Sequence, residues 1–421
     1  MPYKKHLKQI FFNLDKTDYD SEFLLKIKDN VILENKEVGI FDLPNRKQGY
    51  LNCSLDIAKE ISNKYRNLIV CGMGGSSLGA KAICGYKFFD LKYSKNNKKI
   101  YFLDNIHHQN LQSFLNNIDF NNSAFLFISK SGKTIETICQ TLLLIDYYKN
   151  QIEENKAQNL YFITESSEDP NPLAKIANNY NRSIIEHDKD IGGRYSCFTS
   201  VGLIPAAFYD IDIENYLNGG LTILNEFINH ESRLIEDGVY FLQQAQKQNL
   251  NIQVSMPYLA RLYHFNYWYN QLLAESVGKN GKGITPLKAL GSVDQHSVLQ
   301  LFLDGKRDKF FTFLASDNRD KGNELKVPDY LMNEIDYLNK NKLGDVIYAN
   351  QESTIKTIAN KNHLTRRFDI KELDEYSLGQ IMMYFMLETI FYSKIINVNP
   401  FDQPAVEEGK IYARNMLLNR K

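Results

Sequence analysis

The sequence predicts an α/β protein with doubly wound parallel sheets, that is, sheets covered by helices on both faces. From Asn67 onward, short runs of consecutive apolar residues alternate with longer amphipathic stretches. Strands that are apolar on both faces and separated by helices are typical of such a sheet. The chain has 421 residues, and at roughly 100–200 residues per domain this length predicts two or three domains.

The first α/β unit is expected at residues 49–205. Its predicted strands are the apolar runs at 68–71, 100–103, 124–128, 160–163 and 182–185. The first four are each followed by sequence with helical spacing, and the last leads into a Gly-Gly loop. Residues 1–48 have mixed apolar spacing and are expected to form an N-terminal helical arm.

A second, less regular α/β unit is expected at residues 206–395. Its predicted strands are 252–256, 310–314 and 366–370, separated by long helical segments such as 258–277 and 378–396. The pattern places the boundary between the two units only within about residues 205–245. A C-terminal helical segment is expected at 396–421, with an amphipathic helix at 407–418.

The charge and hydropathy of the chain exclude several classes of function. Lys plus Arg equal Asp plus Glu at 50 each, which disfavours a nucleic-acid or anionic-membrane partner. Apolar stretches such as Ala124–Ile128 are far shorter than the ~20 residues that cross a bilayer. The run Ile10–Phe12 is also shorter than the roughly 7–15 apolar residues of a signal peptide. We therefore expect a cytoplasmic protein.

The cysteines are predicted to be buried free thiols. Their number is odd, they are widely spaced and they include no C-x-x-C pair: Cys53, Cys71, Cys84, Cys139 and Cys197. Such spacing favours neither a disulfide framework nor a metal site.

A glycine-rich turn follows the first predicted strand, in the segment Cys71–Gly79. Such a turn lets the backbone approach a phosphate group, while the amides at the start of the next helix attract the anion. The dinucleotide pattern G-x-G-x-x-G is not completed, because its third glycine position holds Ser77. The turn indicates a phosphate site or, alternatively, an ordinary tight strand-to-helix connection.

A second turn, Ser129–Thr134, gathers hydroxyl and ammonium side chains between a strand and a helix. It is not a P-loop, because the leading glycine would have to stand at residue 127, which is Phe. Hydroxyl groups at a helix N-terminus suit a phosphate monoester. Ordinary capping by Ser129 or Ser131 is the alternative, although it accounts for only part of the cluster.

Four further segments carry candidate site residues. In Asp190–Ser196, two glycines precede Arg194, which favours an anion-binding or oxyanion role over a surface salt bridge. Gln271 and Glu275 lie four residues apart on one face of a predicted helix. The other two segments place His296 after a glycine-rich approach, and Gln403 and Lys410 two helical turns apart.

Taken together, these segments resemble the glucose-6-phosphate isomerase (phosphoglucose isomerase) family, in its short bacterial form. The glycine-serine turn, S-K-S-G, D-x-G-G-R-[FY]-S, Q-x-x-x-E, D-Q-H-S and F-D-Q…V-E-x-x-K follow the family's order over about residues 67–415. The resemblance implies two sugar-isomerase (SIS) domains and a homodimer whose active sites lie at the subunit interface. It implies neither a cofactor nor a metal ion.

The resemblance also implies a role for each matching residue. Glu275 corresponds to the base that moves a proton between C2 and C1 through a cis-enediolate, and Arg194 to the cation that stabilises this intermediate. His296, donated by the neighbouring subunit, and Lys410 correspond to the pair that opens the sugar ring. The residues expected to bind substrate are Gln271 and Gln403, together with a phosphate cradle of Gly75, Ser76, Ser129, Lys130, Ser131 and Thr134.

The implied reaction is the interconversion of D-glucose 6-phosphate and D-fructose 6-phosphate, a step of glycolysis and gluconeogenesis. Residue types agree with it, because proton removal next to a carbonyl needs a carboxylate base and an electrophile for the oxyanion. No metal site is expected, since the adjacent His107 and His108 lack the spacing of metal ligands. The sequence departs from the family at Lys133, where relatives often carry a hydroxyl residue, and at Pro404–Ala405, where a glycine usually precedes Val-Glu.

Two alternative functions remain open at this point. One is another SIS-fold isomerase, acting on phosphomannose or an amino-sugar phosphate, which would keep a phosphate turn but not the full set of Gln271, Glu275, His296 and Lys410. The other is a non-catalytic sugar-phosphate sensor, which would be expected to lose Glu275 and to carry a DNA-binding segment. No basic helix-turn-helix segment is visible in the sequence.

Overall fold

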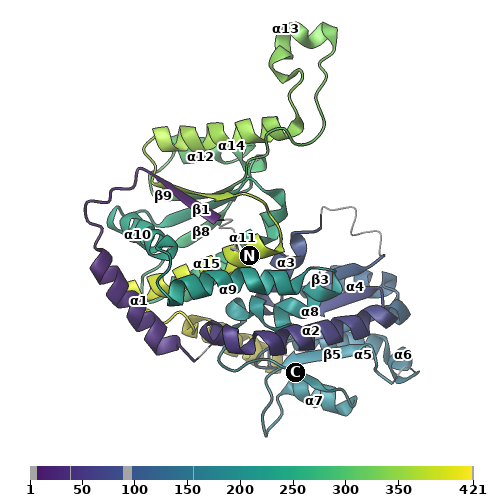
Figure 1. Ribbon diagram of the computed structural model, residues 1–421. Coiled ribbons are helices and arrows are strands. Elements are labelled where there is room, and N and C mark those ends of the chain that lie inside the picture. The colour runs from purple at the N-terminus through teal and green to yellow at the C-terminus, as the bar shows by residue number, and fades with distance from the viewer. Residues whose placement is uncertain (1–6, 38, 89–96, 155, 420–421) are drawn as a thin grey trace.

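The computed structural model describes residues 7–37, 39–88, 97–154 and 156–419. These residues form two five-stranded sheets. Figure 1 shows the second sheet in the upper part of the molecule and the first sheet at the lower right, with long helices between them. The α/β class predicted from the sequence is confirmed.

The first sheet is entirely parallel, in the order β3-β2-β4-β5-β6. Its strands are β2 (Asn67–Cys71), β3 (Lys99–Leu103), β4 (Ser123–Ile128), β5 (Leu160–Thr164) and β6 (Ile184–Glu186). Its helices are α2 (Leu43–Lys64), α3 (Leu78–Gly85), α4 (His108–Asn117), α5 (Ile135–Tyr147), α6 (Lys149–Glu154), α7 (Pro172–Asn179) and α8 (Ser200–Phe208). The strands β2, β4 and β5 are buried along their whole length, which explains their uninterrupted apolar sequences.

The second sheet has the order β1-β10-β9-β7-β8 and is parallel except for β1. Its strands are β1 (Leu7–Phe12), β7 (Ile252–Pro257), β8 (Thr285–Lys288), β9 (Lys309–Ala315) and β10 (Thr365–Ile370). Its helices are α9 (Ile213–Ile228), α10 (Leu234–Lys247), α11 (Tyr263–Val277), α12 (Leu299–Asp304), α14 (Leu343–Asn360) and α15 (Glu375–Ile395). The long helix α15 is buried on all sides from Tyr376 to Ser393 and packs along α9, α10 and α11.

The prediction of a purely helical N-terminal arm is wrong for residues 7–12. These residues form β1, which pairs antiparallel with β10 from Leu7 opposite Ile370 to Phe12 opposite Thr365. The strand covers an edge of the sheet that would otherwise present unpaired backbone groups. The helix α1 (Ser21–Asn35) follows and is capped by Asp20, whose carboxylate accepts from the Phe23 amide at 2.9 Å.

Three other details differ from the sequence prediction. Strand β8 was not predicted, and β6 begins at Ile184 rather than at residue 182. The boundaries expected after residues 48 and 205 fall inside α2 and α8. Because α8 packs on α2 whereas α9 packs along α15, we propose that the chain passes between the two units at residues 209–212.

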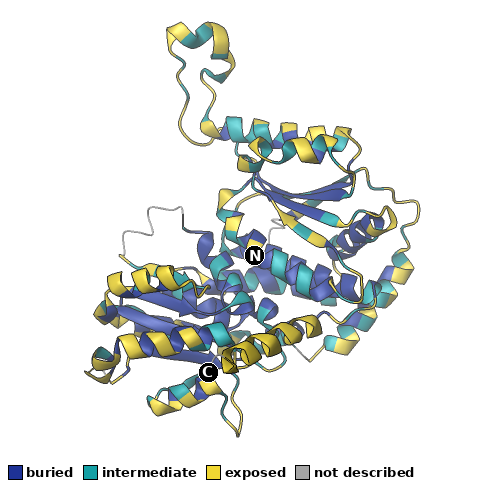
Figure 2. Cartoon of the chain, turned by 180° about the vertical axis from the view of Figure 1, so that it is seen from behind, coloured by how far each residue is buried: buried dark blue, intermediate teal, exposed yellow. Residues whose placement is uncertain are grey.

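Two segments project from the body of the protein. One is an arm at residues 317–342, which carries α13 (Met332–Ile335) between the short helices η8 (Asp329–Leu331) and η9 (Asp336–Leu338). The other is the C-terminal helix α16 (Glu407–Leu418), preceded by the short helix η10 (Pro404–Val406). Every residue of α16 is exposed, as Figure 2 shows.

The cysteines are free thiols, but they are not all buried. Cys71, Cys84 and Cys197 are buried, Cys53 is partly exposed and Cys139 is exposed on α5. Burial raises the pKa of the thiol of Cys71, which suits a structural rather than a reactive role. None of the helices described here combines the length and the apolar character that crossing a membrane requires.

Candidate active site

The two predicted phosphate turns lie at the point where the strand order of the first sheet reverses. β2 has β3 on one side and β4 on the other, so the crossovers leave it in opposite directions. Ligands of such sheets bind in the crevice beyond the carboxyl ends of the strands at this point. The turn at Gly72–Ser77 follows β2 and the turn at Ser129–Thr134 follows β4, so both border the same crevice.

The turn after β4 holds its hydroxyl groups close together at the start of α5. The hydroxyl oxygens of Ser129 and Thr134 are 2.9 Å apart, and the Lys133 amide donates to the Ser131 hydroxyl at 3.3 Å. Thr134 precedes the first turn of α5 but makes no capping bond with its side chain. The turn therefore presents hydroxyl groups beside free helix amides, as a phosphate monoester requires. Lys130 differs from them, because its ammonium donates to the Lys189 carbonyl at 2.7 Å.

The turn after β2 packs against the turn that carries Arg194. A Cβ at Gly75 would lie only 2.2 Å from the carbonyl carbon of Gly193, so no residue but glycine fits there. A Cβ at Gly74 would lie 2.8 Å from the side-chain amide nitrogen of Gln271. Ser76 is buried in the same turn. These contacts join the glycine-rich turn, the Arg194 turn and α11 into one surface.

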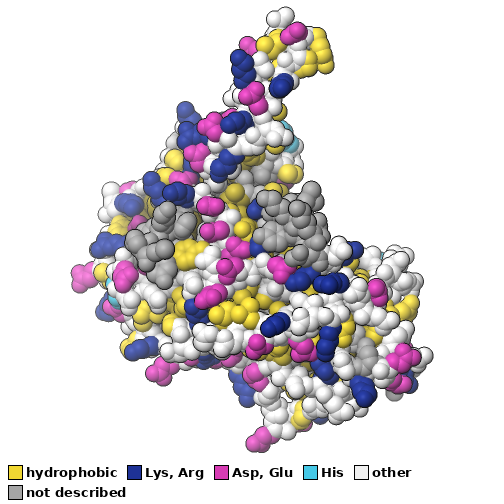
Figure 3. All heavy atoms as spheres, turned by 45° about the vertical axis from the view of Figure 1, so that its right-hand side comes forward, with side chains coloured by type: hydrophobic (Ala, Val, Ile, Leu, Met, Phe, Trp, Pro, Cys, Tyr) yellow, Lys and Arg dark blue, Asp and Glu magenta, His cyan; other side chains and the backbone are white. Residues whose placement is uncertain are grey.

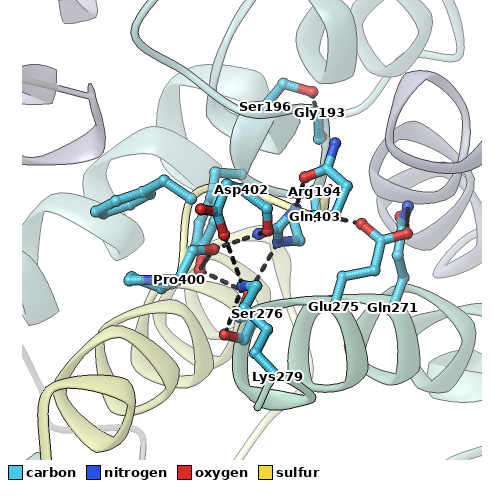
Figure 4. Close-up of polar contacts among 12 residues, drawn as sticks. Gly193, Arg194, Ser196, Gln271, Glu275, Ser276, Lys279, Pro400, Asp402 and Gln403 are labelled. Carbon is cyan, nitrogen blue, oxygen red and sulfur yellow. Dashed lines mark hydrogen bonds and ion pairs between the residues drawn. The ribbon is translucent and has the colours of Figure 1, made fainter. Parts of the chain in front are cut away.

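Arg194 is the centre of this surface. It lies in the short helix η5 (Gly193–Phe198) with a side chain only 2 % exposed. Its guanidinium donates five hydrogen bonds, to Ser276 Oγ (2.8 Å), Glu275 Oε2 (3.2 Å), Gln403 Oε1 (2.9 Å), Asp402 O (3.1 Å) and Pro400 O. Figure 4 shows that these partners come from α11 and from the segment before α16. Arg194 thus connects three regions that are far apart in the sequence.

Glu275 is held on both sides and remains accessible. Its carboxylate accepts from Arg194 and, at 3.1 Å, from the Gln271 side chain one helical turn earlier. The other amide atom of Gln271, Oε1, is buried and has no partner among the described residues. The Glu275 side chain is 35 % exposed and borders a cleft of about 560 Å³ that also touches Gln403 and Val406. A carboxylate oriented in this way can accept a proton from a molecule in the cleft.

His296 and Lys410 do not belong to this hydrogen-bonded centre. His296 is exposed at the end of the short helix η7 (Val293–His296). Lys410 is exposed on α16 and its ammonium is 2.6 Å from the Glu407 carboxylate. Among the residues that the structure describes, no hydrogen bond or ion pair joins either side chain to Glu275 or Arg194. The structure therefore assembles only part of the predicted site within one chain.

The sequence prediction missed Ser276 and Asp402, which accept hydrogen bonds from Arg194, and Lys279, which in turn contacts both of them. Lys279 is four residues after Glu275, a spacing that places it near the same end of α11. This spacing is the one feature of the sequence that points to Lys279. A lone lysine or serine carries no chemical pattern of its own, so the contact could not be deduced. Within the described ranges, no group of three or more His, Cys, Asp or Glu side chains is arranged to hold a metal ion.

Comparisons with known proteins agree with the resemblance seen in the sequence. The sequence model of the phosphoglucose isomerase family matches residues 56–421. The glucose-6-phosphate isomerase of Methanocaldococcus jannaschii is 34% identical over 365 residues, which is 85% of each chain. That of Campylobacter jejuni is 30% identical over 413 residues, covering 97% of this chain and 98% of the relative.

Solved structures share the fold. A hypothetical protein of Thermus thermophilus superposes with a TM-score of 0.87 at 24% identity, covering 97% of this chain and 100% of the other. A glucose-6-phosphate isomerase of Chlamydia trachomatis superposes with a TM-score of 0.72 at 21% identity, covering 86% of this chain and 72% of the other. These structures confirm the arrangement of two sheets with flanking helices.

Proposed function

This chain belongs to the phosphoglucose isomerase family, and we propose that its isomerisation of D-glucose 6-phosphate to D-fructose 6-phosphate takes place at Glu275. The observation that carries the proposal is the position of the Glu275 carboxylate. It lies between the Gln271 amide and the Arg194 guanidinium, at the edge of a cleft. The reaction serves glycolysis and gluconeogenesis, and its partner molecule is a hexose 6-phosphate.

Glu275 acts as the base in this proposal. It takes the proton from C2 of the open-chain aldose, and the electron pair of that bond forms the C1=C2 double bond while the carbonyl pair moves to O1. The same carboxyl group returns the proton to C1, and the O2 hydroxyl proton passes to O1, which leaves the ketone at C2. A positioned general base contributes about 10²–10⁴ in rate.

Arg194 stabilises the negative charge of the enediolate. Its side chain is 2 % exposed, and a fixed cation away from water stabilises an oxyanion more strongly than a solvated one does. Gln271 and Gln403 hold the sugar hydroxyls beside it. Both amides already contact the two charged groups, Gln271 through Glu275 and Gln403 through Arg194.

The phosphate group binds at the crevice of the first sheet. The cradle comprises Gly75, Ser76, Ser129, Lys130, Ser131 and Thr134. Hydroxyl groups and helix amides supply most of its hydrogen bonds, and Lys130 supplies charge from the side of the turn. Because the phosphate is remote from C1 and C2, its binding energy serves to position the reacting end of the sugar.

A second copy of the chain completes the site. His296 and Lys410 are both exposed, and among the described residues neither bonds to Glu275, so one chain does not fix the ring-opening groups beside the base. Exposed apolar side chains lie on α16, namely Ile411, Tyr412, Met416, Leu417 and Leu418. Others lie on the arm at residues 317–342, including Tyr330 and Tyr337. Figure 3 shows hydrophobic side chains at the tip of the projecting arm. Such surfaces are typical of contacts between subunits, and we propose a homodimer that brings His296 to the other chain's site.

The comparisons do not favour the alternative functions, a phosphomannose or amino-sugar phosphate isomerase and a sugar-phosphate sensor. We also propose that the protein acts in the cytoplasm. All five cysteines are free thiols, as expected in a reducing compartment.

Isomerase activity on fructose 6-phosphate, coupled to glucose-6-phosphate dehydrogenase, tests the assignment. Glu275→Gln keeps the size of the side chain and one acceptor oxygen but removes the base, so kcat should fall by about 10²–10⁴. Glu214→Gln, at an exposed position in the first turn of α9, is the matched control and should retain full activity. Equal activity of Glu275→Gln and the wild type would remove Glu275 from the reaction, and an inactive wild type would contradict the function.

A further inference from the structure

A lysine behind the candidate base has all of its hydrogen-bond donors engaged. Lys279 follows the end of α11, and its side chain is only 10% exposed. Its ammonium donates to the Ser276 carbonyl at 2.9 Å and to the Asn399 carbonyl, and it is 3.3 Å from the Asp402 carboxylate. An ammonium has three donors, and three protein oxygens surround that of Lys279, although the residue borders the cleft.

Two of these partners belong to a short loop, Asn399–Gln403, which precedes α16. The loop has its own internal bonds, because the Asn399 side chain accepts from the Phe401 amide and donates to Asp402, both at 3.0 Å. Most of the loop is exposed, and Phe401 is 41% exposed. Burial therefore contributes little to holding the loop in place.

The loop is held between two cations. On one side Arg194 donates to the Pro400 and Asp402 carbonyls and to the Gln403 side chain. On the other side Lys279 binds the Asn399 carbonyl and the Asp402 carboxylate. Figure 4 shows both side chains converging on the same segment. Each cation binds acceptors that the other does not, so both are needed to fix the loop.

The placement of a second cation beside Arg194 has an electrostatic cost. Burial lowers the pKa of Lys279, and the charge of Arg194 lowers it further, whereas Asp402 opposes both effects. If Lys279 served only to fill space, the folded protein would be more stable with an apolar residue at this position. The contacts with the loop are the evident compensation.

We propose that Lys279 is a positioning residue that holds the loop Asn399–Gln403 against Arg194. It thereby keeps Gln403 and the guanidinium in the geometry that the enediolate step needs. The proposal rests on the proposed function of the Glu275 site and extends it to a residue whose ammonium contacts the loop rather than Glu275 or Arg194. A displacement of about 1 Å in a reacting site can lower the rate by up to 10²-fold.

The test compares two lysines that bind the same C-terminal segment. Lys279→Met removes the ammonium and keeps the aliphatic stem. Lys282→Met is the matched control, because Lys282 donates to the Ile396 carbonyl at 2.8 Å, before the loop begins. We expect Lys279→Met to lower kcat by about 10–100-fold with KM changed less than about 3-fold. Lys282→Met should leave both constants unchanged, and Lys279→Arg should recover part of the loss.

A double-variant cycle separates positioning from simple loss of stability. If Lys279 acts by placing Gln403 and Arg194, Lys279→Met should lower kcat by a smaller factor when Gln403→Ala is already present than it does in the wild type. A purely structural role would instead give losses that multiply. Multiplying losses, or an unchanged kcat in Lys279→Met, would overturn the proposal.

A third measurement is independent of catalysis. Hydrogen–deuterium exchange of the peptide at residues 399–406 should be faster in Lys279→Met than in the wild type and in Lys282→Met. Unchanged exchange would refute the clamp even if activity fell. If the wild type showed no isomerase activity, the proposed function would fail, and the exchange result would still decide whether Lys279 holds the loop.

Discussion

The groups assigned to proton transfer and those assigned to ring opening are held very differently. Arg194 is 2 % exposed, donates five hydrogen bonds and fixes Glu275 and Gln403 around it. His296 is exposed at the end of a short helix, and Lys410 is exposed on a helix with no buried residue. Folding of one chain therefore completes the first set of groups but leaves the second set on the surface.

In the proposed homodimer, this difference corresponds to a division of the reaction between the two subunits. A proton transfer through an enediolate needs groups fixed to fractions of an ångström, and the interior of one chain supplies that precision. Groups on exposed segments gain fixed positions only when another surface packs against them. The comparison predicts that variants in the buried set and in the exposed set should behave differently in mixed dimers, in stability and in pH dependence.

The largest effect is expected in a mixed dimer of Glu275→Gln and His296→Ala. Each variant alone should be nearly inactive, but a dimer with one chain of each contains one site with both residues intact. Co-expression with two different tags and purification on both should give about half of the wild-type activity per dimer. This is about 10²–10³-fold above either homodimer.

The matched control is a mixed dimer of Glu275→Gln and Arg194→Lys. Because Glu275 and Arg194 contact each other within one chain, every site of that dimer lacks one of the two residues, and activity should stay low. Recovery in this control would mean that the two residues meet across the interface. Absence of recovery with His296→Ala would contradict the assignment of His296 to the second subunit.

The next largest effect is expected for Arg194→Lys, which keeps the charge but loses the planar fork. A lysine cannot replace the five hydrogen bonds to Glu275, Gln403 and the loop carbonyls. We expect kcat to fall by about 10²-fold and the free energy of unfolding to fall by about 1–3 kcal/mol. Coupled assays and thermal unfolding measure the two quantities.

The exposed residue should separate these two quantities. His296→Asn should lower kcat, but its thermal midpoint should equal that of the wild type. The midpoints are to be measured at a low protein concentration, where the chain is monomeric. A loss of stability in that variant as large as in Arg194→Lys would show that the exposed and the buried groups do not differ as described.

The sequence predicts the centre of each sheet better than its edges. β2, β4, β5 and β9 are buried on both faces, so their sequences are apolar runs, interrupted within β9 only by Thr312. The edge strand β8 has four residues, includes Pro286 and is largely exposed, which gives no such signal. β1 was missed for a similar reason, because it is an edge strand whose pairing depends on β10, more than 350 residues away.

The candidate site shows the same limit. Gln271 and Glu275 are recognisable because a helix brings positions four apart to one face. Arg194 and Gln403 meet at 2.9 Å although 209 residues separate them, and only the tertiary fold creates that contact. Lys279 and Arg46 were not predicted, because a lone charged residue in a sequence is indistinguishable from one on a solvated surface.

The smallest effect is expected at Arg46, which anchors the chain just before the Arg194 turn. Its guanidinium donates to both carboxylate oxygens of Asp190, at 2.8 and 2.7 Å, and to Asp42 at 2.6 Å. Asp190 also accepts from the Gly39 amide at 2.7 Å. Arg46→Gln should therefore loosen the turn and lower kcat by about 10-fold, while the free energy of unfolding at pH 7 falls by about 2 kcal/mol.

The pH dependence of that loss identifies its cause. Hydrogen bonding to Arg46 holds the pKa of Asp190 in the folded protein below its ordinary 3.8. The pair therefore stabilises the folded protein fully above pH 3.8. This contribution disappears as the pH falls through the lower pKa that Asp190 has in the folded protein. Thermal midpoints of the wild type and Arg46→Gln should accordingly converge below about pH 4. Lys247→Gln breaks an exposed pair with Asp18 at the end of α10 and should leave kcat unchanged. A constant difference between the wild type and Arg46→Gln at all pH values would show that Arg46 acts by packing, because only the loss of an ion pair depends on the charge of Asp190.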